Sequence, residues 1–543
     1  MKTNKIFGVV ALTAALLGAT VLSGPSFAAN VPDGTKLATE QVFKYRVLDN
    51  INSVDPGIVE DVDTSYVVSN LFEGLYNEDT DGNPVPGVAE SYDVNPENTV
   101  YTFHLRDAKW SNGDPVKASD FVFAWQRAVD PKLASPYAYF LGLAGIVNAD
   151  DIVAGKKQPS ELGVKAIDDK TLQVSLNASV PYLVRMLAHA TLFPVPQSVV
   201  EKFGADWTKP ENIVGNGAYT MAENSPGERV VLKRNPNYWD DAKTVINEVQ
   251  FLTINDENQG LIRYQAGEVD QTDVPAGQFP QLKAQFPNEA VSVPQLCTYY
   301  FSINVTDTAT DAFKDVRVRQ AISYAIDRDV IVNKILQGGQ QAAYFFSPPA
   351  TAGFQPPDLE YAKMSQADRE AKAKELLAEA GYGADNPLSF DYIYNTSEAH
   401  KKIAIAVSQM LKEKLGVTMN IQDMEFATLL DTRHQKNYQV ARNAWCGDYN
   451  EASTFESLLD SKSEQNDSGY NNPEVDKLLL ASKTSKDPNV EYKQVEEAIA
   501  KDVPIIPIYF YAKVFMQKPN VKGWPLNNVE QLWYAKDLYK VAE

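Results

Sequence analysis

The segment 440–451 (VARNAWCGDYNE) places four chemically distinct side chains within a short stretch of chain. They are Arg442, Trp445, Cys446 and Asp448. A guanidinium and a carboxylate can hold the charged groups of a ligand, and an indole offers a rigid amphipathic surface. A cysteine adds a covalent anchor that can fix such a segment in place. The segment therefore predicts one wall of a binding site.

The second cysteine, Cys297, lies far upstream, and the chain has no others. A bridge between Cys297 and Cys446 would close a long loop and contribute up to about 5 kcal/mol in the chain-entropy account of disulfide stabilisation. Two cysteines in an oxidising compartment usually pair, and two buried free thiols are the alternative. The compartment therefore decides whether this wall is anchored covalently.

The first residues indicate which compartment the protein occupies. Lys2 and Lys5 form a short basic region, residues 6–22 are mostly apolar, and residues 26–28 (SFA) provide a cleavage site. Residues 1–28 are therefore typical of a secretory signal peptide. The alternative is a membrane anchor, but no basic cluster follows the apolar run, and no later stretch reaches about 18 uninterrupted apolar residues. We expect an exported protein that is not inserted in the membrane, which in a bacterium means a periplasmic one.

Size and charge narrow the class of protein further. A chain of 543 residues is too long for one core, so we expect two or three domains. The formal net charge of −21 repels phosphate backbones, which argues against nucleic acid as a partner. Aromatic residues make up 10% of the chain and serve binding surfaces as well as cores.

The spacing of apolar residues predicts a mixed α/β protein. Alternation predicts strands at 101–105, 388–394 and 417–421, and helical periodicity predicts helices at 118–129 and 400–415. The second helix should end at Gly416, and with its flanking strands it forms a β-α-β unit. Open α/β sheets bind ligands beyond the carboxyl ends of their strands, where helix N-termini also gather.

Searches for catalytic motifs fail. The sequence lacks G-x-S-x-G, G-x-x-x-x-G-K-[ST], H-E-x-x-H and G-x-G-x-x-G. Its histidines and cysteines do not have the spacing of zinc ligands, so we expect no metal site and no cofactor. This absence favours a binding protein over an enzyme.

Several motifs, in their order and content, resemble the extracellular solute-binding proteins of family 5, which deliver peptides to ABC importers. These motifs are GNPVPGVAESYDVNPENTVYTFHLRDAKWSNGDPVKASD (82–120), GNGAY (215–219), NPNYW (235–239), YQAGEVD (264–270) and VRVRQAISYAIDR (316–328). A second set is similar to the oligopeptide-binding members of that family: ASPY (134–137), LCTYY (296–300), YNTS (394–397), DTRHQ (431–435) and AWCGDYNE (444–451). The resemblance covers nearly the whole mature chain.

The resemblance implies an α/β fold like that of type II periplasmic binding proteins, with two lobes, a hinge and an additional smaller domain. By that resemblance, lobe I combines residues 29–72, 197–296 and 513–543. The additional domain II spans 73–196, and lobe III spans 297–512. The lobes are expected to close around the ligand by hinge motion, and the protein is expected to be a monomer.

The resemblance also assigns roles to particular residues. Strand-like hydrogen bonds from both lobes would hold the peptide backbone, while Asp448 binds its ammonium group; a loop-capping aspartate is the alternative. Cationic side chains would bind the carboxylates of the ligand; the alternative for them is a solvated or structural role. Aromatic rings would line the ligand, and the alternative for them is packing in the core. The implied carboxylate-binding residues are Arg442, Arg433 and His400, the lining residues are Tyr137, Trp445, Tyr511 and Glu60, and further contributors are Tyr300 and Asn395.

Two positions depart from the family pattern. Leu336 stands where a lysine can meet the carboxylate of a longer peptide, and Phe426 replaces a pocket tryptophan. We therefore predict that tripeptides bind at least as well as tetrapeptides. The function implied is a receptor for peptides of about two to five residues that serves an inner-membrane ABC permease complex. The alternatives are a receptor for murein-derived peptides and, from another class, a secreted peptidase.

Overall fold

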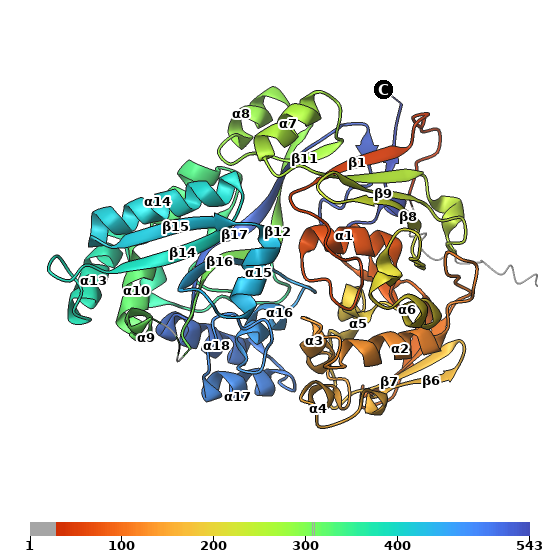
Figure 1. Cartoon of the computed structure of the whole chain (residues 1–543), viewed down its shortest axis with the longest axis horizontal. Helices are drawn as coiled ribbons and strands as arrows, with labels where there is room; N and C mark the ends of the chain where they lie inside the picture. The colour runs from red at the N-terminus through yellow and green to blue at the C-terminus, as the bar shows by residue number, and fades with distance from the viewer. Residues whose placement is uncertain (1–28, 307, 309, 543) are drawn as a thin grey trace, which may run out of the picture.

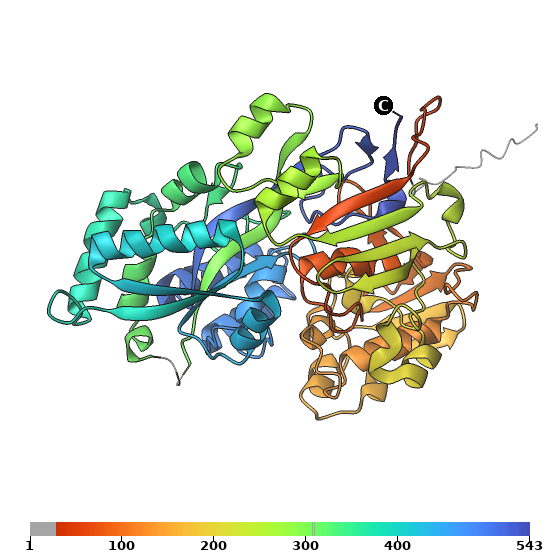
Figure 2. The ribbon, with the colours of Figure 1, turned by 45° about the horizontal axis from the view of Figure 1, so that its top comes forward.

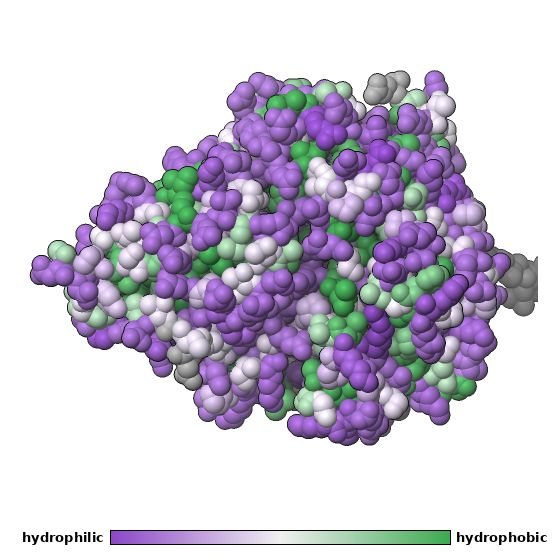
Figure 3. All heavy atoms as spheres, in the orientation of Figure 1, coloured by the Kyte–Doolittle hydropathy of each residue, from purple (hydrophilic) through white to green (hydrophobic). Residues whose placement is uncertain are grey.

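The protein has two lobes that lie side by side (Figure 1). The computed structural model describes residues 29–306, 308 and 310–542, and the predicted signal peptide at 1–28 lies outside this part of the chain. Within the described residues, no helix combines the length and apolarity required to span a bilayer. Figure 3 shows one face of the molecule, on which hydrophilic side chains predominate.

An eleven-stranded sheet runs through both lobes. Its strand order is β15-β14-β16-β12-β17-β11-β1-β10-β9-β8, with the short β13 (Gln341–Ala342) paired to β17. The lobe with β14 to β16 is called lobe III here, and the lobe with β1 and β8 to β11 is called lobe I. The bounds are β1 Val42–Val47, β8 Tyr219–Ser225, β9 Arg229–Arg234, β10 Glu248–Thr253, β11 Gln271–Asp273, β12 Ala290–Ile303, β14 Ser389–Asn395, β15 Thr418–Met424, β16 Val440–Cys446 and β17 Ile505–Gln517.

Strands β12 and β17 connect the two lobes. They pair antiparallel along most of their length, and the expected domain limits at 296/297 and 512/513 fall inside them. Their register shifts between Pro294 and Thr298, so the intervening residues of β12 leave the β17 ladder. There Leu296 instead donates its N–H to the carbonyl of Val529 and accepts from the N–H of Gly447. This irregularity brings the end of β16 to the crossing point between the lobes.

A smaller antiparallel sheet forms the core of domain II, in the order β4-β5-β7-β6. Helix α2 (Ala118–Ala128) packs against it with Phe121 and Trp125 buried. The predicted strand at 101–105 and helix at 118–129 are confirmed, since both follow from regular apolar spacing. The strands are β4 Ala89–Val94, β5 Val100–Leu105, β6 Val164–Asp168 and β7 Thr171–Ser175.

The β-α-β unit of lobe III also matches the prediction. Strands β14 and β15 pair in parallel, and α14 (Glu398–Leu415) connects them and lies alongside both (Figure 2). Ile403, Val407 and Leu411 form its buried face. Gly416 ends the helix with a φ of 71°, the left-handed conformation that glycine adopts most readily. The mixed α/β class is therefore confirmed.

The remaining longer helices are distributed over both lobes and domain II (Figure 1). They are α1 Val62–Leu71, α3 Ala138–Leu143, α6 Gln197–Phe203, α7 Glu257–Gln265, α8 Phe279–Gln285, α10 Val316–Ala325, α13 Gln366–Glu379, α15 Phe426–His434, α17 Pro473–Ser482 and α18 Asn489–Asp502.

Candidate functional site

A cavity of about 450 Å³ lies between the lobes, and we call it the interlobe cleft. It brings together every side chain that the sequence nominated for binding, although these come from all three parts of the fold. Leu336 and Phe426, the two departures from the family pattern, line it as well. The nominated residues are Glu60, Tyr137, Tyr300, Asn395, His400, Arg433, Arg442, Trp445, Asp448 and Tyr511.

Asp448 lies just beyond the end of β16, where the loop is held in place. Its backbone N–H donates to the hydroxyl of Thr454 at 2.9 Å. Its side chain is 9% exposed, accepts a hydrogen bond from the Tyr137 hydroxyl at 3.1 Å, and lies 3.5 Å from Nε2 of His189. Burial and then the Asp448 carboxylate raise the pKa of Tyr137 well above its usual value, so the phenol keeps the proton that it donates. A carboxylate held by a phenol and an imidazole retains the capacity to bind a cation.

His189 is a cleft residue that the sequence did not single out. It precedes a 3-10 turn, and Nδ1 of its ring accepts from the N–H of Thr191 at 3.3 Å. That contact leaves Nε2 as the protonated nitrogen of the neutral ring, directed at Asp448. No motif marks His189, and only its proximity to Asp448 in space reveals it.

The two cysteines form a disulfide, so the predicted pairing is confirmed. Cys297 and Cys446 lie opposite each other in the ladder between β12 and β16. Their separation along the sequence is 149 residues. The bond fastens the strand that carries Arg442 and Trp445 to the strand that crosses between the lobes.

Replacing both Cys297 and Cys446 with serine is expected to lower the stability by about 2–4 kcal/mol, because the unfolded chain regains the entropy of a long loop. The expected change in peptide affinity is much smaller, since β14 and β12 still flank β16. Thermal unfolding with and without a tripeptide checks both expectations. An unchanged unfolding midpoint would contradict the first.

Arg442 projects from β16 into the cleft and is 8% exposed. Its guanidinium donates to the Tyr511 hydroxyl at 3.2 Å and lies 5.4 Å from the centre of the Tyr299 ring. Nε of Arg442 is buried without a hydrogen-bond partner. Leaving a buried donor unpaired is costly, so this guanidinium is well suited to an anionic ligand group.

His400 lies in the first turn of α14, beside Asn395 at the end of β14. Its Nδ1 is 2.9 Å from Oδ1 of Asn395. Burial, and then the charge of Arg442, lower the pKa of His400 well below the usual value for imidazole. The ring is therefore neutral at neutral pH, and its one N–H, on Nδ1, donates to the Asn395 oxygen. Its Nε2 is then an acceptor, so the ring offers a ligand carboxylate neither a positive charge nor a hydrogen-bond donor.

Arg433 already has protein partners. Its Nε lies 3.3 Å from Oδ2 of Asp467, and its guanidinium donates to the side chain of Asn443. Arg433 lines the cleft and is 5% exposed, but Asp467 and Asn443 hold its guanidinium. This arrangement favours the structural alternative for Arg433 and leaves Arg442 as the cation best placed for a ligand.

The aromatic residues divide into two groups. Trp445 stacks on Tyr137 with ring centroids 6.1 Å apart, and its indole N–H is buried without a partner. An unpaired donor beside the cleft suits a peptide carbonyl. Tyr300 is 4% exposed and packs edge-on against Phe346, so packing accounts for most of its surface.

No three histidine, cysteine, aspartate or glutamate side chains of the described residues gather closely enough to hold a metal ion. The polar groups of the cleft include carboxylates, guanidinium groups, imidazoles, phenols and amides. They suit a ligand that carries charges of both signs at its ends.

Comparison with known proteins identifies the family. Residues 83–467 match the bacterial extracellular solute-binding proteins, family 5. The chain belongs to this family. It is 46% identical to the periplasmic oligopeptide-binding protein OppA of Salmonella typhimurium, over 97% of this chain and 98% of that protein.

A solved relative shows the same arrangement of lobes. The murein tripeptide binding protein MppA of Escherichia coli superposes with a TM-score of 0.92 at 42% identity, covering 94% of this chain and 100% of that one. An unliganded open form of MppA gives a TM-score of only 0.67, at 43% identity and with coverage of 94% and 99%. Since the fold is shared, the difference in score indicates that the lobes of the present structure are not arranged as in that open form.

Proposed function

We propose that the protein is a periplasmic receptor that binds short peptides with little sequence specificity and delivers them to an ABC peptide importer. One observation carries the proposal: Asp448 and Arg442 offer opposite charges, each nine-tenths buried, to the same cleft. A peptide with a free ammonium and a free carboxylate has the complementary charges.

The spacing of the two charges suits a short ligand. Arg442 and Cys446 lie four residues apart on the extended strand β16, which corresponds to about 13 Å, and Asp448 follows two residues later. Three extended residues of a peptide span about 10 Å, and the flexible arginine side chain covers the remainder. Between these ends the ligand backbone would pair with the cleft walls in the manner of an added strand.

The relatives support the proposed compartment of the protein. The Salmonella relative is named as a periplasmic oligopeptide-binding protein, which fits a chain with a predicted signal peptide and a disulfide. We propose that the protein works as a monomer in the periplasm and docks on an inner-membrane permease complex. The domain limits given by the resemblance are proposed with it, and they make β12 and β17 the hinge.

A receptor for murein-derived peptides is the second candidate. The similarity to the murein tripeptide binding protein favours it, because that protein shares both the fold and the arrangement of the lobes. Mass spectrometry of ligand released from protein purified from its host separates the two candidates. Diaminopimelate-containing peptides would support the murein reading, and mixed short peptides would support the general one.

Calorimetry with alanine peptides of two to five residues tests the proposed function and its length preference. Tripeptides are expected to bind at least as well as tetrapeptides, because Leu336 offers no charge to the carboxylate of a longer ligand. A clear preference for tetrapeptides would contradict this. The tripeptide should also be recovered intact after prolonged incubation, whereas cleavage would indicate a peptidase.

A further inference from the structure

A cluster of four ionisable side chains spans the two lobes beside the cleft. His434 ends helix α15 of lobe III, and its Nε2 lies 3.5 Å from Oε2 of Glu60 in lobe I. The same nitrogen lies 3.9 Å from Oδ1 of Asp467. Asp467 in turn pairs with Arg433 through its other oxygen, at 3.3 Å. Glu60 and Asp467 both line the cleft, so a ligand can reach the two carboxylates between which His434 lies.

Three atoms of this cluster are buried without hydrogen-bond partners. They are Nε of Arg433, Nε2 of His434 and Oδ1 of Asp467, and Asp467 is only 4% exposed. A buried carboxylate oxygen without a partner is costly, so the site favours any donor that reaches it. The side chain of Glu60 is also largely buried, with an exposed fraction of 23%.

The charges of the cluster depend on His434. With a neutral imidazole, Glu60 and Asp467 are opposed by Arg433 alone, which leaves one negative charge in excess. With a protonated imidazole, the four groups sum to zero. Histidine is the side chain that ordinarily changes charge between about pH 5 and pH 8.

We infer that His434 determines the side-chain preference of this part of the cleft: when neutral, it leaves Glu60 and Oδ1 of Asp467 available to a basic side chain of the peptide, and when protonated, it takes that cation's place. The inference rests on the proposed function. It predicts a receptor that prefers a lysine-containing peptide at neutral pH and loses the preference on acidification.

Other groups near the cluster also affect its charge. Burial raises the pKa of Glu60, while His434 and Arg433 act in the opposite direction, and the neighbouring Asp61 raises it further. Two further cleft carboxyls titrate in the same range, since burial is the main cause that raises the pKa of Asp49 to about 6 and that of Asp63 to about 7. A pH profile of the wild-type protein alone is therefore insufficient, and the variant of His434 is needed.

The test compares Ala-Lys-Ala with Ala-norleucine-Ala by calorimetry at about pH 7.5 and about pH 5.5. In the wild-type protein, the lysine peptide is expected to bind about tenfold more tightly at the higher pH, and the ratio should approach one at the lower pH. In His434→Gln, the preference should persist at both pH values. In Glu60→Gln, the preference for the lysine peptide should be weak at both pH values.

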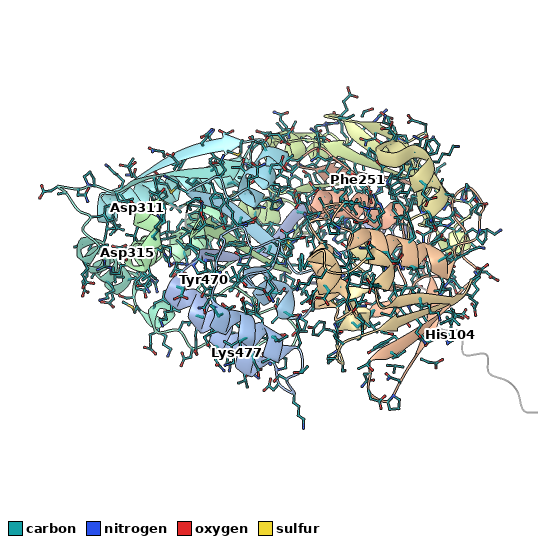
Figure 4. All side chains as sticks on the ribbon, turned by 60° about the horizontal axis from the view of Figure 1, so that its bottom comes forward. His104, Phe251, Asp311, Asp315, Tyr470 and Lys477 are labelled. Atoms are coloured by element: carbon teal, nitrogen blue, oxygen red, sulfur yellow. A yellow bond between two sulfur atoms is a disulfide. The ribbon has the colours of Figure 1, made fainter. Side chains whose placement is uncertain are left out.

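His104→Gln is the matched control. His104 lies at the opposite end of the molecule from Asp311 and Asp315 of lobe III (Figure 4), and its Nε2 contacts the exposed Asp93 at 2.8 Å. This variant should behave as the wild-type protein does. The wild-type protein also gives a measurement without any variant: near pH 6.5, Ala-Lys-Ala should release more protons on binding than the norleucine peptide, as measured in two buffers.

A wild-type ratio that does not change with pH would overturn the inference, and so would an equal change in His434→Gln. The proposed function has a separate criterion. If trialanine binds but the ratio is constant, only the role of His434 is wrong, whereas failure to bind any of the peptides would reject the proposed function itself.

Discussion

Replacing Asp448 with asparagine is expected to weaken tripeptide binding at least about a hundredfold, or about 3 kcal/mol. The carboxylate is 9% exposed and is held by Tyr137 and His189, neither of which can replace the missing charge. The bound ammonium would then be buried beside a neutral amide, which does not repay its desolvation. Calorimetry with trialanine measures the effect.

An acetylated peptide separates the charge contribution from general damage to the cleft. N-acetyl-trialanine lacks the ammonium, so its weak binding should change little between wild type and Asp448→Asn. Asp107→Asn, which removes an exposed carboxylate of domain II, should leave binding of trialanine unchanged. Equal losses for the free and acetylated peptides would show that Asp448 does not bind the ammonium.

Replacing Arg442 with glutamine should weaken tripeptide binding by about 2–3 kcal/mol, or roughly 30- to 150-fold. The imidazole of His400 is neutral because burial and Arg442 itself lower its pKa, so it cannot supply the missing charge. Loss of Arg442 removes this second cause, but the burial of His400 persists.

Trialanine amide, which has no carboxylate, completes the comparison for Arg442. Its affinity is expected to be low in the wild-type protein and nearly the same in Arg442→Gln. The loss of affinity on removing the peptide carboxylate and the loss on replacing Arg442 should therefore be strongly non-additive. Arg263→Gln is the control, because Arg263 is a partly exposed residue of α7 that pairs with Glu268. Additive losses would indicate that the peptide carboxylate binds elsewhere.

Local sequence patterns predicted the elements that are regular and self-contained. The strand β5, the helix α2 and the β-α-β unit follow from apolar spacing and from a helix-ending glycine, both of which act over a few residues. The order of the large sheet could not be predicted in this way, because β12 and β17 pair across more than two hundred residues. The register shift between Pro294 and Thr298 depends on contacts with β16 and Val529, which no local pattern reveals.

The site shows the same division. Arg442, Trp445 and Asp448 stood out because they share one short segment, and all line the cleft. Tyr137 and Glu60 could be nominated only through the resemblance, since they come from distant segments. The neutral state of His400 depends on its burial and on Arg442, and the contact of His189 with Asp448 joins segments that lie far apart in the chain. Neither is visible in a linear sequence.

The disulfide joins β16 to the part of β12 where that strand leaves the ladder with β17, so it ties the segment that leads to Asp448 to the proposed hinge. A residue near a hinge moves little when the lobes rotate about it. The Asp448 carboxylate should therefore keep its position whether the cleft is open or closed, and the N-terminus of a peptide can bind before its C-terminus is enclosed. Capture of the ammonium group would then precede enclosure, and enclosure would add the contacts of Tyr137 and His189 to the same carboxylate.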